Sequence, residues 1–317
     1  MKITIRNTGL LLLIGLIASC GPSTEKSSPF KFEYDPQGIK LFENDKAVFF
    51  YQKEPKSSNG GYICNNYIHP LFALNGDTLT EEFPDDHPYH RGIFWSWHQL
   101  YINNKSIGDG WIMKNISQEV VDLHPNAGKL SASLNLKILW RSGLYKNKKA
   151  FIEESTSIIV HQMKSDMRKI DIEISLQALV PGVSIGGSDD EKGYGGLCAR
   201  IKLPDDIVFT AENGPVTPDR LQILAGSWMD FSGSFGSGEN QNGLAILCHP
   251  DTPNYPAPWI LRQESSMQNI VFPGRDRVPI AMDHSLKLKY RLIVHAGNAD
   301  EADLAMLQSE YLGLKTE

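Results

Sequence analysis

The sequence predicts an all-β protein: one large antiparallel β-sandwich (a supersandwich) with a single helix near the C-terminus. The main observation is an alternation of apolar and polar side chains, which recurs in three long segments, 131–140, 170–176 and 286–294. A period of two places one face of a strand on a core and the other in water. Almost no helical pattern separates these segments. Antiparallel sheets are therefore favoured, because parallel strands need long crossovers that are usually helices.

Short β-type runs begin the folded part of the chain. Residues 30–34, 39–42 and 47–51 are rich in aromatic and β-branched side chains. The sequences between them, Asp-Pro-Gln-Gly and Glu-Asn-Asp-Lys, are typical of turns. This pattern predicts an opening meander of three strands.

One helix is expected, at the end of the chain. Asn298 can cap a helix over residues 299–312, whose first turn contains acidic side chains. Leu304, Leu307 and Tyr311 would share one side of this helix. We expect that side to cover the edge of a sheet.

The N-terminus predicts export and a lipid anchor. Basic residues precede the apolar run 10–17, which is too short to span a bilayer comfortably and is typical of a signal peptide. The sequence Ile-Ala-Ser before Cys20 resembles a bacterial lipobox, which implies cleavage before Cys20 and its diacylation. We therefore expect a signal peptide over 1–19, a flexible tether over 20–29 and one β-sandwich domain over 30–317. The mature protein would be held in the cell envelope, on the extracytoplasmic side of a membrane.

Charge and cysteine content exclude some classes of function. The formal net charge is −6, and no basic stripe interrupts the sequence, so nucleic acid is not an expected partner. Cys64, Cys198 and Cys248 lack the Cys-x-x-Cys spacing of a thiolate metal site. One disulfide is possible among these three, and the sequence does not select the pair.

The stretch 67–99 is the richest in side chains that carry chemistry. It holds four of the nine histidines of the chain together with carboxylates, an arginine and two tryptophans. Its middle, 85–92, contains Pro88, which removes a backbone donor and predicts a rigid loop. The apolar run 93–98 that follows predicts a buried strand entered from this loop.

We expect acid/base chemistry on a sugar from this stretch, because imidazoles exchange protons near neutral pH and carboxylates accept them. One histidine and one carboxylate would form the donor and acceptor pair. Arg91 would hold substrate oxygens and Trp97 would stack on the sugar ring. The catalytic candidates are His87, His90, Glu81, Glu82 and Asp86, and the binding candidates from this stretch are His69, Arg91, Trp97 and His98.

Two further segments are candidates for substrate contact. Residues 249–259 contain four prolines, which stiffen a loop and fix its aromatic side chains. The glycine-rich segment 186–196 lacks the strand-to-helix context of a phosphate loop. It is expected to be either a solvated hairpin or a lid or sugar-contacting loop. We expect a surface position for His295, on the polar face of the last strand. The binding candidates outside the first stretch are Tyr194, Asp230, His249, Trp259 and Arg262.

Most of the mature chain resembles a bacterial family named methane oxygenase PmoA-like. The resemblance is most specific in the stretch 67–99, in the sequence Asn-Tyr-Pro-Ala-Pro-Trp at 254–259, and in the closing segment 288–297. That family is similar to galactose mutarotase-like β-supersandwich proteins and often accompanies sugar-degrading systems. The resemblance therefore implies the same fold and a role with carbohydrates.

Three hypotheses follow for function. The first is a carbohydrate-active lipoprotein enzyme, an epimerase, lyase or hydrolase, that needs no cofactor or metal. The second is a non-catalytic lipoprotein that binds glycans with the same aromatic and charged side chains. The third is a metalloenzyme that uses His69, His87, His90 and His98 as ligands, since imidazoles and a carboxylate bind zinc, iron or copper.

Overall fold

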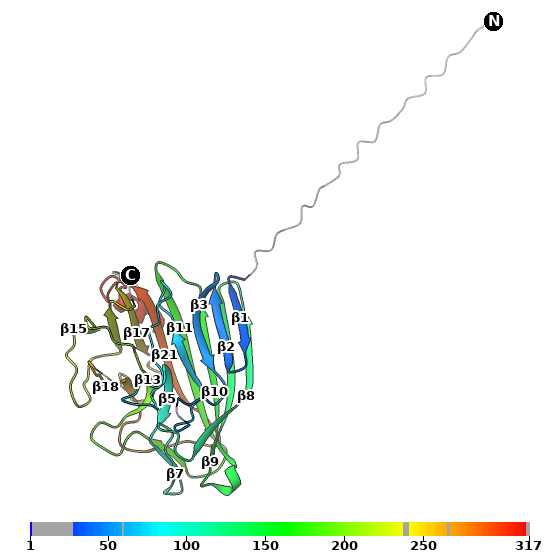
Figure 1. Cartoon of the computed structure of the whole chain (residues 1–317), viewed down its shortest axis with the longest axis vertical. Coiled ribbons are helices and arrows are strands. Elements are labelled where there is room, and N and C mark those ends of the chain that lie inside the picture. Colours follow the sequence, from blue (N-terminus) through cyan, green and yellow to red (C-terminus); the bar gives the residue numbers. More distant parts are fainter. Residues whose placement is uncertain (2–27, 59, 237–240, 265–266, 315–317) are drawn as a thin grey trace.

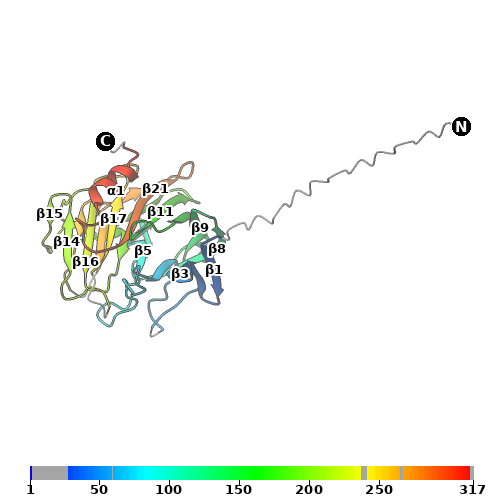
Figure 2. The same ribbon diagram turned by 90° about the horizontal axis from the view of Figure 1, so that it is seen from above.

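Two antiparallel sheets face each other and enclose the core (Figures 1 and 2). The structure is a computed structural model, and it describes Met1 and residues 28–58, 60–236, 241–264 and 267–314. The predicted signal peptide and Cys20 lie outside the described residues. This architecture confirms the predicted all-β sandwich. Within the described part of the chain, no helix is long and apolar enough to cross a membrane.

The first sheet has eight strands in the order β1-β2-β3-β4-β5-β13-β19-β18. The predicted opening meander is confirmed as its first three strands, which pair in sequence. The strands are β1 (Phe30–Asp35), β2 (Gly38–Glu43), β3 (Lys46–Gln52), β4 (Tyr67–Leu71), β5 (Ile93–Trp97), β13 (Gly195–Ala199), β18 (Trp259–Ile260) and β19 (Gln268–Val271).

The second sheet has nine strands in the order β15-β14-β16-β17-β21-β11-β10-β9-β8. The predicted alternation is confirmed in β9 and β11, where every second side chain is buried against the first sheet. In β21 only the first part alternates, and residues 290–295 are all buried. The strands are β8 (Ile116–Ala127), β9 (Ser131–Ser142), β10 (Ala150–His161), β11 (Met167–Ala178), β14 (Val208–Ala211), β15 (Gly214–Pro215), β16 (Trp228–Gly233), β17 (Asn242–Cys248) and β21 (Leu286–Ala296).

A smaller sheet of four strands follows the order β20-β12-β6-β7. Its strands are β6 (Gln99–Ile102), β7 (Lys105–Gly108), β12 (Val183–Gly186) and β20 (Val278–Pro279). Strand β7 lies at the lower end of the molecule in Figure 1, opposite the end where β1 begins. A short 3-10 helix, η1 (Lys146–Lys148), lies between β9 and β10.

A buried carboxylate ties the two large sheets together beneath the loop that enters β5. Glu154 of β10 is fully buried and accepts hydrogen bonds from the indole N–H groups of Trp95 and Trp140, both at 2.8 Å. Asn66 and Thr156 donate to the same carboxylate. Burial raises the pKa of Glu154, and these four donors act in the opposite direction by stabilising the charged form. Strand β5 is therefore fixed to the larger sheet.

The C-terminal helix is shorter than predicted and covers a different surface. Helix α1 (Leu304–Tyr311) begins after Asp303, whose side chain accepts from the N–H of Met306 at 3.2 Å. Asn298 instead caps a preceding turn by accepting from Asp300 and Glu301. The helix packs on the outer face of the nine-stranded sheet rather than on an edge. The edge prediction was wrong because the outer face of β16, β17 and β21 carries apolar side chains that need cover.

The three cysteines of the domain are buried and free. Cys64 lies before β4, Cys198 lies in β13, and Cys248 ends β17. Burial raises the pKa of each of these thiols. The disulfide that the sequence left possible is therefore not formed among them.

Candidate functional site

The loop that precedes β5 is closed by backbone hydrogen bonds. The N–H of Phe83 donates to the carbonyl of His90 at 2.8 Å, and two consecutive turns lie between them. Gly92 then enters β5 with a φ of +45°, and a Cβ there would stand 2.0 Å from the carbonyl oxygen of Ile68. Only glycine fits this close approach. The predicted rigid loop is therefore present, and its side chains have fixed directions.

A carboxylate orients the first histidine of this loop. The Nδ1 of His87 lies 2.7 Å from Oδ2 of Asp86, and a carboxylate only accepts, so Nδ1 donates. Arg200 approaches the same carboxylate with Nη2 3.1 Å from Oδ1. Burial raises the pKa of Asp86, but the bonds from His87 and Arg200 outweigh it and lower the pKa. The Asp86–His87 pair therefore leaves Nε2 of an about one-third exposed imidazole for other partners.

The second histidine of the loop is buried and neutral. Nη1 of Arg200 lies 3.1 Å from Nδ1 of His90, and an arginine only donates, so Nδ1 accepts and the ring proton is on Nε2. Burial lowers the pKa of His90 to about 2, with help from the positive charges around it. The rings of His87 and His90 stack with centroids 4.4 Å apart. His90 therefore acts as a hydrogen-bond donor at neutral pH and not as the proton carrier that the sequence suggested.

A second carboxylate–histidine pair lies beyond β5. The Nδ1 of His98 donates to Oδ2 of Asp109 at 2.9 Å, and both side chains are about one-quarter exposed. The other oxygen of Asp109 accepts from the N–H groups of Trp111 and Ile112. These bonds fix the carboxylate, which in turn fixes the imidazole with Nε2 directed away from it. His98 and His87 therefore share one arrangement, in which a carboxylate holds Nδ1 and Nε2 points away from it.

Trp111 joins the two pairs. Its ring stacks on His98 with centroids 4.9 Å apart and meets the edge of His90 at 6.3 Å. Tyr194 packs against it from the glycine-rich loop at 5.5 Å. We define the two-pair site as Asp86–His87 and Asp109–His98 together with Arg200, His90 and Trp111. Tyrosine rings border it: Tyr89 contacts His87, His90 and Tyr62, and Tyr194 lies under the Arg262 guanidinium.

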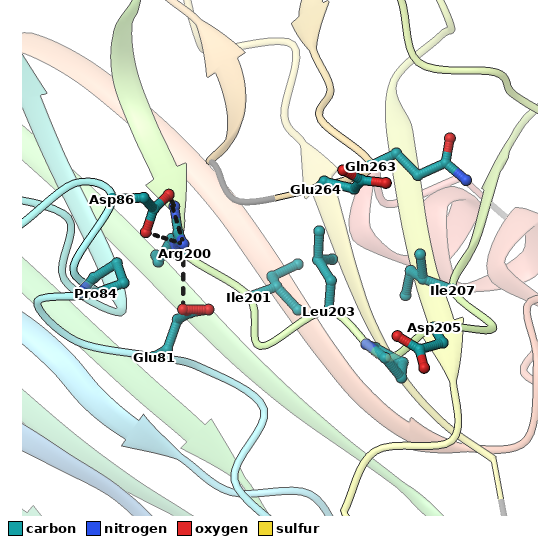
Figure 3. A pocket seen from close by; sticks show the side chains of 11 residues that line it. Glu81, Pro84, Asp86, Arg200, Ile201, Leu203, Asp205, Ile207, Gln263 and Glu264 are labelled. Atoms are coloured by element: carbon teal, nitrogen blue, oxygen red, sulfur yellow. Dashed lines mark hydrogen bonds and ion pairs between the residues drawn. The ribbon is translucent and has the colours of Figure 1, made fainter.

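A cavity of about 510 Å³ adjoins the two-pair site (Figure 3). Arg200 lies between Asp86 and Glu81 on one side of this cavity, and Glu264 lies across from them. Ile201 and Leu203 contribute apolar surface between these groups. The volume falls in the range of small-molecule sites, roughly 300–1,000 Å³.

Arg200, Asp109 and Trp111 were not predicted as functional residues. Arg200 follows β13, and Trp111 lies in the loop after β7, so both reach the site from segments that the sequence gives no reason to place beside residues 83–92. The Asp-Gly-Trp sequence at 109–111 is the one local signal, because an aspartate before glycine often caps its own turn.

Both tryptophans expected to stack on a sugar are part of the core. Trp97 and Trp259 have no exposed surface, and their indole N–H groups donate to the carbonyls of Phe272 and Gly226. These predictions are corrected, because a ring without accessible surface cannot contact a substrate. All five residues of β5 are buried, so the alternation that separates core from surface is lost there.

Arg91 is also a structural residue. Its side chain is buried, and Nη1 donates to the carbonyls of Tyr89 and Trp111 at 3.0 and 3.1 Å. The guanidinium lies 4.1 Å from the ring centre of Phe94. Arg91 therefore holds the loop to the segment that carries Trp111, which corrects its predicted role in binding substrate oxygens.

Glu82 and His69 belong to a separate group of side chains. Glu82 accepts from the hydroxyl of Tyr67 at 2.6 Å and forms an ion pair with Lys56. His69 forms a hydrogen bond with Thr80. Burial lowers the pKa of His69, and the nearby Glu82 carboxylate only partly opposes this shift. Glu81, in contrast, pairs with Arg200. Successive residues of this extended segment point in opposite directions, so only Glu81 contacts the two-pair site. The prediction that Glu82 could act as the partner of a catalytic histidine was therefore wrong.

Asp230, His249 and His295 lie on the outer face of the nine-stranded sheet. Asp230 and His295 form a buried pair with Nε2 2.8 Å from Oδ1, beneath the segment that leads to α1. His249 packs against Tyr311 of α1. Neither Asp230 nor His249 is part of the two-pair site, and His295 is buried rather than exposed. The sequence did not reveal this, because the cover supplied by the C-terminal segment is a tertiary feature.

The four histidines of the first stretch do not form one ligand set. Within the described residues, no three His, Cys, Asp or Glu side chains are grouped so that they could hold a metal ion. The rings of His87 and His90 are nearly parallel, with an angle of 4°, so the lone pairs in their planes do not converge. Thr80, Asp86 and Asp109 occupy Nδ1 of His69, His87 and His98, respectively.

The arrangement can donate and accept protons on a bound molecule. His87 and His98 each have one nitrogen fixed by a carboxylate and one nitrogen available, and ring contacts through His90 and Trp111 connect them. No curated protein matches the chain. Residues 39–308, which include every residue of the two-pair site, match the family of unknown function DUF6807. The chain therefore belongs to this family.

Proposed function

We propose that the protein is a carbohydrate-active enzyme that transfers protons on a sugar or glycoside, as an epimerase, lyase or hydrolase. The observation that carries this proposal is the pair of carboxylate-oriented imidazoles, Asp86–His87 and Asp109–His98, which are connected by ring contacts through His90 and Trp111. Acid/base catalysis needs one group that accepts a proton and another that donates it. Two histidines whose Nδ1 atoms are already bonded meet this requirement with their Nε2 atoms.

Neighbouring groups support a hydroxyl-rich substrate. His90, fixed as the tautomer with hydrogen on Nε2, would donate to a substrate oxygen, while Glu81 and Glu264 would accept from hydroxyl groups. The half-buried rings of Tyr89 and Tyr194 would pack on the apolar face of a sugar. The cavity of about 510 Å³ would hold the part of the substrate that extends past Arg200.

The N-terminal sequence supports a location for this activity. Cleavage before Cys20 and its acylation would tether the enzyme to the extracytoplasmic side of a membrane. The enzyme would then act in the bacterial cell envelope, in the periplasm or at the cell surface.

A glycan-binding protein is the second candidate function. The tyrosine pair Tyr62–Tyr89, with ring centres 5.3 Å apart and Tyr62 exposed, favours it, because such rings bind sugars without any proton transfer. A binding protein would retain its ligand unchanged.

The experiment that separates these functions is proton NMR of the full chain in D₂O with a panel of mono- and disaccharides and their keto derivatives. An enzyme would exchange a carbon-bound proton, interconvert two isomers or release a product, and His98→Asn would abolish that change. His124→Asn is the matched control, because His124 is 75% exposed on β8. Line broadening of a sugar that is never converted would favour the binding protein, and a conversion unaffected by His98→Asn would refute the proposed site.

A further inference from the structure

A second cavity, of about 500 Å³, lies on the outer face of the nine-stranded sheet, between α1 and the turn that joins β10 to β11. Its apolar lining comes from Met167, Met306 and Leu307, and Leu130 at its rim is 75% exposed. We call this cavity the helix groove. Apolar side chains exposed at a rim mark a surface that excludes water when a partner binds.

Basic side chains surround this apolar lining. Lys164, Lys169 and Arg291 line the groove, against one acidic lining residue, Glu310. Lys169 is paired with Glu310, and Arg291 is paired with Asp171. Lys164 is exposed in the β10–β11 turn and makes no ion pair with any described residue. An amphipathic anion would match this combination of apolar lining and basic rim.

The chain enters the fold beside the helix groove. The hydroxyl of Ser28 donates to the carbonyl of Gly128 at 2.7 Å, next to the rim residue Leu130. A hollow lined by Ser28, Lys31 and Lys129 shares Gln162 with the groove. Only eight peptide links separate Ser28 from Cys20. A chain of that length spans at most about 30 Å, so a lipid on Cys20 would hold this end of the molecule close to a bilayer.

We infer that the helix groove binds an anionic phospholipid of the membrane to which Cys20 tethers the protein. Lys164 would contact the phosphate, and Leu130 and Met306 would contact the upper acyl chain. Basic residues near a membrane surface are attracted by anionic lipids, and apolar side chains add to this attraction. The inference rests on the proposed lipid anchor and is independent of the sugar chemistry.

Docking through the groove would orient the catalytic site. Strand β1 begins and the described chain ends near one end of the fold, and β7, which precedes Asp109, lies at the other end (Figure 1). A bilayer at the tether end would therefore leave the second carboxylate–histidine pair facing away from the membrane.

The test measures which end of the protein touches the lipid. The full acylated chain carries a thiol-reactive fluorophore at Leu130→Cys or at Leu144→Cys, both exposed turn residues at opposite ends of β9. Twelve residues of strand separate them by roughly 40 Å. The three other cysteines that the structure describes, Cys64, Cys198 and Cys248, are buried. The protein is placed in vesicles of phosphatidylcholine alone or with one-third phosphatidylglycerol, each with a lipid-borne quencher.

We expect quenching at position 130 to exceed that at position 144 at least threefold in the anionic vesicles. This ratio should fall by half or more with Lys164→Glu and in neutral vesicles. Lys105→Glu is the matched control, because Lys105 is an exposed lysine of β7, at the opposite end of the molecule.

Three results would overturn the inference: equal quenching at both positions, equal quenching at 130 in neutral and anionic vesicles, or an N-terminal peptide without acyl groups by mass spectrometry. The second result would assign the orientation to the tether alone. Circular dichroism of each variant checks that the fold is kept. Loss of sugar conversion with intact quenching would count only against the proposed enzyme.

Discussion

Two carboxylate–imidazole pairs in this molecule have nearly the same nitrogen–oxygen distance but differ in their exposure to solvent. His87 donates to Asp86 at 2.7 Å in the loop before β5, and His295 bonds to Asp230 at 2.8 Å beneath the C-terminal segment. The first pair is about one-third exposed, whereas the second has almost no exposed surface. The contact between the two groups therefore does not distinguish a candidate catalytic pair from a structural one.

The difference lies in the second ring nitrogen. In His295 it lies 3.1 Å from the carbonyl oxygen of Ala296, so both nitrogens donate and the ring is an imidazolium. Burial lowers the pKa of His295, but the bonds to Asp230 and Ala296 outweigh it and raise the pKa. Among the residues that the structure describes, none is a fixed acceptor for the second nitrogen of His87. A carboxylate–histidine pair can transfer protons to a substrate only where one nitrogen stays available.

The largest expected effect is on turnover. His87→Asn or His98→Asn should lower the rate of sugar conversion by about 10²–10⁴-fold, the usual contribution of a positioned acid or base. Both side chains are partly exposed, so the free energy of unfolding should change by less than about 1 kcal/mol. Rate measurements beside urea unfolding test both statements. The comparison fails if His124→Asn is equally damaging.

The buried pair should respond in the opposite way. Asp230→Ala leaves the imidazolium of His295 without its partner, which should lower the free energy of unfolding by about 3–5 kcal/mol. Sugar conversion by the folded protein should be unchanged. Asp283→Ala provides the control, since Asp283 and His284 form an exposed pair whose removal should leave the free energy of unfolding nearly unchanged. Equal losses of stability in the two variants would contradict the assignment.

Arg200 should affect the site through the groups that it positions. Arg200→Met removes its bonds to Asp86 and His90, and we expect about a tenfold loss of turnover, or roughly 1.4 kcal/mol. The pKa of Asp86 should rise without Arg200, because the guanidinium helps to lower it. The acidic limb of the pH–rate profile should therefore move to higher pH. A purely structural role would lower stability and leave that limb in place.

The smallest expected effect is the pH dependence of stability. The raised pKa of His295 means that its pair stabilises the fold fully below the unfolded pKa of about 6.5, and that this stability is lost as pH rises through the folded pKa. Urea unfolding between pH 5 and 9 should show a decline of roughly 1 kcal/mol in the wild type. The decline should be absent from the double variant Asp230→Ala/His295→Ala.

The fold was predictable because alternation is a local property. Each long strand shows on its own which side faces the core, and the prediction held for β9 and β11. In β21 it held only for the first part, because the C-terminal segment also covers the outer face of that strand. The helix boundary failed because Asn298 and Asp303 can both cap a turn, and only packing selects Asp303. A capping residue in the sequence indicates that a turn begins but not that it continues as a helix.

The candidate site was predictable only in part. Composition located the loop with Asp86 and His87, since polar and imidazole groups are concentrated there. It did not locate Arg200, which reaches the loop through the pairing of β13 with β5, or Trp111, which comes from the loop after β7 of the smaller sheet. It also overvalued Trp97, because burial of both faces of a central strand removes the periodic signal.

The most direct test of the central claim is NMR of the full chain with ¹⁵N-labelled histidine, titrated with the sugar that the panel identifies. The account predicts that the side-chain nitrogen signals of His87 and His98 shift as the sugar binds, while those of His295 and His124 do not. Saturable binding that leaves His87 and His98 unchanged would contradict the account, because the sugar would then occupy another part of the molecule.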